Sequence, residues 1–88
     1  MKVHFNKTFL KELSAIPSKS RVRIEKLVFE DIQEYRNISQ IPSIKKLAGY
    51  SAYYRIRIGD YRIGIKLAGD DLIFERVLHR KEIYKRFP

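Results

Sequence analysis

The side chains best suited to chemistry in this sequence are basic and aromatic, and they gather in the second half of the chain. Arginine forks match the paired oxygens of a phosphate, and tyrosine rings can stack on unpaired bases. This combination suits single-stranded RNA or DNA better than the groove of a duplex. The residues that we expect at such a site are Lys45, Lys46, Tyr53, Arg55, Arg57, Arg62, Lys66, Arg80, Lys81 and Tyr84.

Most standard enzyme signatures are missing. The sequence has no GxSxG motif, no glycine-rich phosphate loop and no pair of carboxylates among the basic residues. It also has no cysteine and only two separate histidines, so we expect neither a metal site nor a cofactor. His79 follows an apolar segment, and we favour a structural hydrogen bond over acid–base work for it; His4 is expected at the surface.

The net charge of +9 bears on the partners of the protein. The residues after Pro42 carry +6 of this excess. Nucleic acid, an acidic protein and an anionic membrane surface are the usual partners of such a chain. No apolar run is suited to a signal peptide or to crossing a bilayer, which indicates a cytoplasmic protein with no membrane partner. The length predicts one domain over residues 1–88.

A β-hairpin is predicted over residues 53–66, where apolar and basic residues alternate on both sides of Gly59-Asp60. A two-residue loop with glycine first suits a type II′ turn. The register then puts one set of pairs on an apolar face, namely Ile58 with Tyr61, Ile56 with Ile63 and Tyr54 with Ile65. The other face carries Arg57 opposite Arg62, Arg55 opposite Gly64 and Tyr53 opposite Lys66.

Arginines directly opposite one another repel, so the cationic face needs an explanation. One interpretation is a solvated outer face whose long side chains splay apart. The other is an anion site in which Gly64 leaves a gap between the arginines, where a ligand or a backbone segment approaches closely.

The remaining elements must position this hairpin. Val3 and Phe5 predict a short first strand ending at Asn6. Helical spacing predicts a short helix from Lys7 to Pro17 and a second helix from about Ser18 to Tyr35, whose charged outer face we interpret as solvated surface. Residues 44–49 lead into the hairpin. Residues 72–78 are apolar on both sides, which indicates a strand in the middle of the sheet, and residues 82–88 form a last turn or short helix.

The predicted order is β-α-α-β-β-β in a single small α+β domain, with a helical hairpin packed on a mainly antiparallel sheet. On this background three runs are informative: Lys-Lys-Leu-x-Gly from Lys45, the hairpin run from Tyr54 to Ile63, and His-Arg-Lys-Glu-Ile-Tyr ending at Tyr84. Together they make the chain resemble the RelE/ParE superfamily of toxins from type II toxin–antitoxin systems, and the resemblance covers nearly the whole chain.

The RelE-like branch of that superfamily implies a ribosome-dependent endoribonuclease that cuts mRNA without a metal. Its reaction is attack by a 2′-hydroxyl on the adjacent phosphate. The resemblance also implies a RelB-like antitoxin as partner, besides ribosome and mRNA, and a toxin–antitoxin complex that binds its own operator DNA. Carried over by position, the implied catalytic residues are Arg55, Arg57, Arg62 and Tyr84. For the C-terminal basic residue of the family a strict match, counted back from Tyr84, falls on Leu78, and we assign the role to the neighbouring Arg80, which occupies a position that is basic in many relatives.

One position departs from the RelE pattern. Arg57 stands where a lysine acts as the general base, and a guanidinium is effectively never deprotonated. Arg57 would therefore stabilise the developing 2′-oxyanion while another group handles the proton. Two other functions remain open: a ParE-like toxin that binds DNA gyrase without catalysis, and a protein that binds RNA or DNA without cutting it. A nuclease requires Arg62 and Tyr84 to face one cavity.

Overall fold

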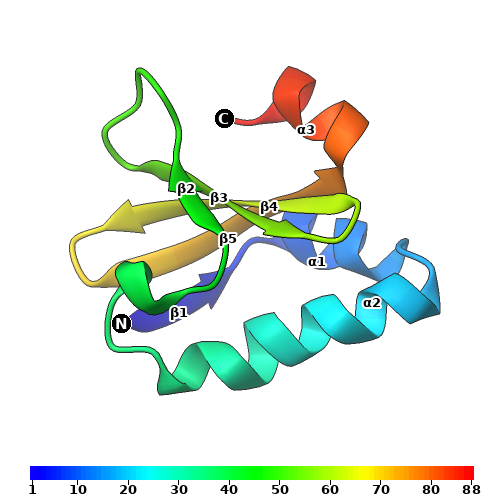
Figure 1. Cartoon of the computed structure of the whole chain (residues 1–88), viewed down its shortest axis with the longest axis horizontal. Coiled ribbons are helices and arrows are strands. Elements are labelled where there is room, and N and C mark those ends of the chain that lie inside the picture. The colour runs from blue at the N-terminus through cyan, green and yellow to red at the C-terminus, as the bar shows by residue number, and fades with distance from the viewer.

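The computed structural model describes all 88 residues, which form one five-stranded sheet with helices on both faces (Figure 1). The strands are β1 (Lys2–Phe5), β2 (Ile44–Lys46), β3 (Tyr53–Ile58), β4 (Tyr61–Ala68) and β5 (Asp71–His79). The helices are α1 (Lys7–Ser14), α2 (Ser18–Glu25) and α3 (Arg80–Arg86), with a π-helical turn η1 (Lys26–Glu30) and two 3₁₀ turns, η2 (Asp31–Glu34) and η3 (Ile38–Gln40).

The strand order is β1-β5-β4-β3-β2, and only the β1–β5 pair is parallel. This confirms the α+β class and the interior position predicted for β5. The structure adds one strand to the predicted order, because residues 44–46 form the edge strand β2 beside β3. Three residues are too few to show an alternating pattern in the sequence.

The hairpin of β3 and β4 has the predicted register at all six pairs, from Ile58 opposite Tyr61 to Tyr53 opposite Lys66. Gly59 has φ of 58° while Asp60 does not have a positive φ, as a type II′ turn requires. The two faces of the hairpin are therefore the ones that the sequence indicated.

The apolar face of the sheet carries the core. Figure 1 shows α1 and α2 on one side of the sheet and α3 on the other. Ile56, Ile63 and Ile65 of the hairpin are fully buried in the main core, which α1 and α2 complete with Phe9 and Ile24. None of the helices combines the length and the apolar character that a membrane-spanning helix needs.

The second helix differs from its prediction, because it changes its winding twice. After α2 the Asp31 N–H donates to the Lys26 carbonyl, which is the hydrogen bond of a π turn, and a 3₁₀ turn follows. Val28 and Ile32 both stay buried in this arrangement, and the ring of Phe29 reaches that of Phe5 at 5.1 Å. The apolar spacing of the sequence is compatible with all three windings and does not distinguish them.

A carboxylate continues the sheet edge where β1 ends. Beyond Phe74, strand β5 has no further partner on that side, and Glu12 of α1 accepts hydrogen bonds from the Val77 N–H at 3.1 Å and from the Arg76 guanidinium. The bond to Glu12 is the main reason that the pKa of Arg76 is raised. Arg76 also donates to the carbonyl of Arg86 at 3.3 Å, so this ion pair links α1 to the end of α3.

Candidate functional site

The cationic face of the hairpin lies at the floor of a hollow of about 580 Å³ that we call the arginine hollow. Its walls come from the loop before β2, from β2, from both hairpin strands and from α3. The lining residues are Ser43, Ile44, Lys45, Arg55, Arg57, Arg62 and Tyr84. Four of the five predicted catalytic residues are thus brought together, and Arg62 and Tyr84 face one cavity.

Arg62 is the most buried charge in the molecule, with 8% of its surface exposed. Its Nη1 donates to the carbonyl oxygens of Gly59 and Tyr61, both at 2.9 Å, and it forms no ion pair with any carboxylate. Arg57 lies opposite it on the neighbouring strand. A buried cation held only by backbone carbonyls is stabilised further by any anion that enters the hollow.

Tyr84 reaches the hollow from α3. The Arg55 guanidinium carbon lies 4.9 Å from the centre of the Tyr84 ring, a cation–π contact that fixes the direction of the ring. The tyrosine itself is 63% exposed. Its ring therefore keeps free surface on which an unpaired base can stack.

The gap predicted at Gly64 is not open to a ligand. A Cβ at this position would lie 2.7 Å from ring atoms of Phe87, because the chain after α3 folds back and places that ring against the strand. Phe87 also packs edge-on against Tyr53, with ring centroids 5.6 Å apart. The close approach that glycine permits here is thus used by the protein's own C-terminal segment, which anchors α3 above the hairpin.

Five of the predicted site residues lie outside the hollow. Lys66 lies over the Tyr53 ring, with Nζ 5.6 Å from its centre, on the same sheet face. Lys46 is exposed at the end of β2. Arg80 and Lys81 are exposed in the first turn of α3, where the Arg80 N–H donates to the Asp60 carbonyl at 2.8 Å. The predicted catalytic role of Arg80 thus has no support from its position.

Both histidines have structural partners. His79 is the N-cap of α3, since its Nδ1 accepts a hydrogen bond from the Lys81 N–H at 3.2 Å, and its ring packs edge-on against Tyr61. This agrees with the structural hydrogen bond that we favoured. His4 lies at the surface, 2.9 Å from an oxygen of Asp71.

Ser43 lines the hollow and was not predicted. It is the one non-glycine residue with a positive φ, 57°, and its carbonyl accepts a hydrogen bond from the Arg57 N–H at 3.2 Å. The only local signal in the sequence is its position between Pro42 and the short strand that follows.

Comparison of the sequence with known families gives a match over residues 3–84 to the ParE toxin of the type II toxin–antitoxin system parDE. The chain is also similar to Toxin RelE3 of Methanocaldococcus jannaschii, with 53% identity over 89 aligned positions that span the whole of both proteins.

The fold is also found in solved structures. The toxin chain of a RelB–RelE antitoxin–toxin complex from Methanococcus jannaschii superimposes with a TM-score of 0.81 at 50% identity, covering 97% of this chain and 99% of that one. The Mycobacterium tuberculosis RelBE2 complex contains a chain that matches with a TM-score of 0.71 at 21% identity, covering 90% and 96%. The second similarity is one of fold alone.

Proposed function

Since the chain belongs to the ParE toxin family of type II toxin–antitoxin systems, we propose that it is a RelE-like toxin that cuts mRNA on the ribosome. The observation that carries the proposal is the position of Arg62. Its guanidinium is buried, has no acidic partner, and shares the arginine hollow with Tyr84 and two further arginines. Such a site holds a phosphate whose negative charge grows during a reaction.

The proposed reaction takes place at one RNA phosphate. The 2′-oxygen of the preceding ribose forms a bond to phosphorus, the bond from phosphorus to the 5′-oxygen of the next nucleotide breaks, and the electron pair leaves with that oxygen. The 2′-hydroxyl loses a proton and the departing 5′-oxygen gains one. The products are a 2′,3′-cyclic phosphate and a free 5′-hydroxyl.

The charges in the hollow suggest a role for each side chain. Arg62, held in place by two carbonyls, donates to the oxygens of the pentavalent phosphorus. Arg57, on the opposite strand, stabilises the 2′-oxyanion without accepting its proton. Arg55 holds the ring of Tyr84 in the direction that stacks on a base, and Lys45 at the edge of the hollow binds a flanking phosphate.

The direct test is primer extension on mRNA from ribosomes incubated with wild type, Arg57→Lys and Arg57→Ala. Lysine keeps the charge and can release a proton when neighbouring arginines lower its pKa, so Arg57→Lys should retain much of the cleavage or increase it. Arg57→Ala should lose it. Wild-type protein that produces no ribosome-dependent cuts would exclude the nuclease function.

We further propose that a RelB-like antitoxin is the protein partner, because the similar M. jannaschii chain is a toxin in a RelB–RelE complex. The net charge of +9 predicts an acidic partner and fast, electrostatically steered association. Association rates measured at low and high salt test this. A rate that does not fall as salt increases would mean that apolar contacts select the partner instead.

One observation favours a second candidate function, because the family match carries the description of a ParE toxin. A ParE-like protein would bind DNA gyrase through its basic surface and cleave no RNA. A gyrase supercoiling assay with the purified protein separates the two: inhibition without mRNA cleavage supports the ParE-like function, and cleavage without inhibition supports the RelE-like one.

A further inference from the structure

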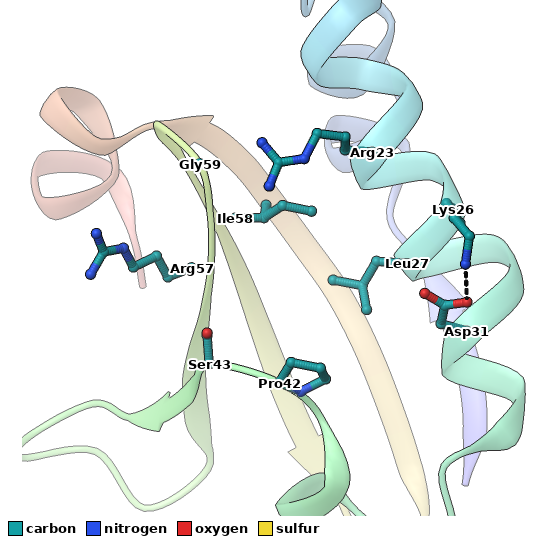
Figure 2. Close-up of a pocket in the computed structure, with 9 residues that line it drawn as sticks. All are labelled: Arg23, Lys26, Leu27, Asp31, Pro42, Ser43, Arg57, Ile58 and Gly59. Atoms are coloured by element: carbon teal, nitrogen blue, oxygen red, sulfur yellow. Dashed lines mark hydrogen bonds and ion pairs between the residues drawn. The ribbon is translucent and has the colours of Figure 1, made fainter.

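A second hollow, of about 500 Å³, lies between the second helix and the end of the hairpin (Figure 2). We call it the helix hollow. Figure 2 shows Leu27 and Ile58 pointing toward one another across it, with Arg23 extending from α2 toward the hairpin turn. The residues that line it include Arg23, Lys26, Leu27, Ser43, Arg57 and Ile58.

The helix hollow has an unpaired positive charge at its mouth. Arg23 is exposed and forms no ion pair, and its Nη1 lies 3.2 Å from the point where a Cβ on Gly59 would stand. Its guanidinium therefore reaches from the helix to the tip of the hairpin. Lys26, by contrast, is paired with Asp31 at 2.8 Å, and their hydrogen bond, followed by the charge of Asp31, raises the pKa of Lys26. That pair contributes little net charge, so Arg23 and Arg57, which also lines the hollow and forms no ion pair, supply the attraction for an anion.

The two hollows lie on opposite faces of the hairpin and share part of their lining. Ser43 and Arg57 line both of them and form the wall where they meet, and Figure 2 shows the Arg57 side chain pointing away from Leu27. The wall contains the one left-handed non-glycine residue, Ser43, and such strained residues gather at binding sites. The opposite wall of the helix hollow contains the π turn η1, a type of turn that is frequent at functional sites. Lys26 begins this π turn and Asp31 directly follows it.

We propose that the helix hollow binds the nucleotide next to the cleaved one, with Arg23 contacting the phosphate that neighbours the scissile phosphate. This inference rests on the proposed function. An RNA strand has one phosphate per nucleotide, so a strand that leaves the arginine hollow past Ser43 and Arg57 carries its next phosphate around the edge of the hairpin. Arg23 is the cation on the far side of that wall.

An apolar peptide segment fits the helix hollow less well. Leu27 is 8% exposed, so it offers little apolar surface to a partner. Three of its exposed lining residues are basic, namely Arg23, Lys26 and Arg57, and arginine matches phosphate with two parallel hydrogen bonds. Charge complementarity and the lining shared with the arginine hollow both favour RNA over a protein segment here.

The test combines a change in the protein with a change in the RNA. Ribosomes are programmed with mRNA in which the phosphate on either side of the scissile one is replaced by a neutral methylphosphonate. With wild-type protein, one of the two replacements should lower kcat/KM for cleavage about tenfold, the size of one charge-assisted hydrogen bond to phosphate. Arg23→Ala should cleave unmodified mRNA about tenfold less efficiently and should lose nothing further from the same replacement.

Two protein variants serve as controls. Arg23→Lys keeps the charge and should recover part of the loss. Lys19→Ala removes one charge from the exposed surface of the same helix but lines neither hollow, so it should cleave like wild type and stay sensitive to the replacement.

The outcomes separate the inference from the function on which it rests. Suppose that the wild-type protein cleaves mRNA and that both phosphate replacements lower kcat/KM of Arg23→Ala as much as they lower that of the wild type. This result would overturn the inference and leave the proposed function intact. If Arg23→Ala cuts normally but binds an acidic antitoxin more weakly, the helix hollow belongs to the protein partner. Absence of cuts with wild-type protein would overturn both.

Discussion

Arg62 and Tyr84 line the same hollow but are held in it by different means. Arg62 is on a strand in the centre of the sheet, and its guanidinium is fixed by the carbonyls of the hairpin that contains it. Tyr84 is on a seven-residue helix, too short to be stable alone, which depends on distant parts of the chain. These supports are the buried side chain of Ile83, the Phe87 ring on Gly64 and the hydrogen bond from Arg76.

This difference has a functional meaning. The charge-stabilising half of the hollow is built from local contacts and persists as long as the hairpin does. The half with Tyr84 depends on contacts between α3 and distant residues, so we expect it to be displaced more easily than the hairpin. A partner that inactivates the protein by moving α3 would therefore need less binding energy than one that deforms the hairpin.

The largest effect is expected from Arg62→Ala. Loss of a preorganised donor to the growing phosphate charge should reduce cleavage by about two to three decades. The fold should persist, because the two carbonyls that Arg62 releases lie at the exposed hairpin end. Cleavage on translating ribosomes, together with thermal unfolding, checks both points. Arg36→Ala removes an exposed charge outside both hollows and is the matched control. If the Arg62→Ala protein is folded and as active as wild type, Arg62 does not stabilise the phosphate charge and this role is refuted.

The second prediction concerns the anchor of α3. Phe87→Ala removes a side chain that is 9% exposed and should destabilise the docked helix by about 3 kcal/mol, at the lower end for a buried phenylalanine. Cleavage should fall while the hairpin stays folded. Gly64→Ala should have a similar effect, because its methyl group would collide with the ring.

A double-mutant cycle of these two changes tests the contact itself. In the combination of Gly64→Ala with Phe87→Ala the ring that would collide is gone, so the second change should cost less than it does alone, by about 0.5–3 kcal/mol. Urea unfolding of wild type, the two single variants and the double variant gives the free energies of unfolding. Amide exchange of α3 in the same four proteins gives the stability of the docked helix. Strictly additive losses would show that Phe87 does not lie on Gly64 in solution.

Tyr84 variants distinguish stacking from proton transfer. Tyr84→Phe keeps the ring over Arg55, so it should retain most of the cleavage if the ring stacks on a base. Tyr84→Ala should lose about 1–3 kcal/mol, the value of one stacked base. The measurement is kcat and KM for each variant. If Tyr84→Phe is as inactive as Tyr84→Ala, the hydroxyl takes part in the chemistry.

The smallest effect is expected from His79→Asp. An aspartate in the N-cap position accepts the same Lys81 N–H and favours the helix N-terminus by about 0.5–1 kcal/mol, so α3 should be slightly more stable and cleavage should be nearly unchanged. His79→Leu, which has no acceptor, is the control and should lose a similar amount of stability. A large loss of cleavage in His79→Asp would assign the histidine to acid–base work.

The two halves of the hollow also differ in how far the sequence predicts them. The hairpin register follows from alternation in one segment, because a slip by one residue would exchange its faces. The position of Phe87 cannot be predicted from one segment in this way. It depends on where the chain after α3 returns to the sheet, more than twenty residues after Gly64. The sequence suggested a close approach at Gly64 but could not identify its occupant.

The helix hollow was missed for a related reason. Arg23 and Lys26 belong to the second helix, whose charged face we interpreted from the sequence as solvated surface. Only the three-dimensional structure shows that this face lies near Ser43 and Arg57. The π turn is a choice between hydrogen-bonding patterns that differ by one residue, and the spacing of apolar side chains fits either pattern. Arg80 was placed by position in a motif, which does not determine the direction of its side chain.

The sheet topology has a consequence for the order of events during synthesis. Strand β5 lies between β1 and β4, so the earliest strand has no partner until the latest one has been made. The segment that carries Tyr84 and Phe87 follows β5 and docks only on a finished sheet. A growing chain on its own ribosome therefore lacks the complete hollow until the segment with Tyr84 and Phe87 has emerged, so the site that we propose acts on mRNA is the last part of the fold to form.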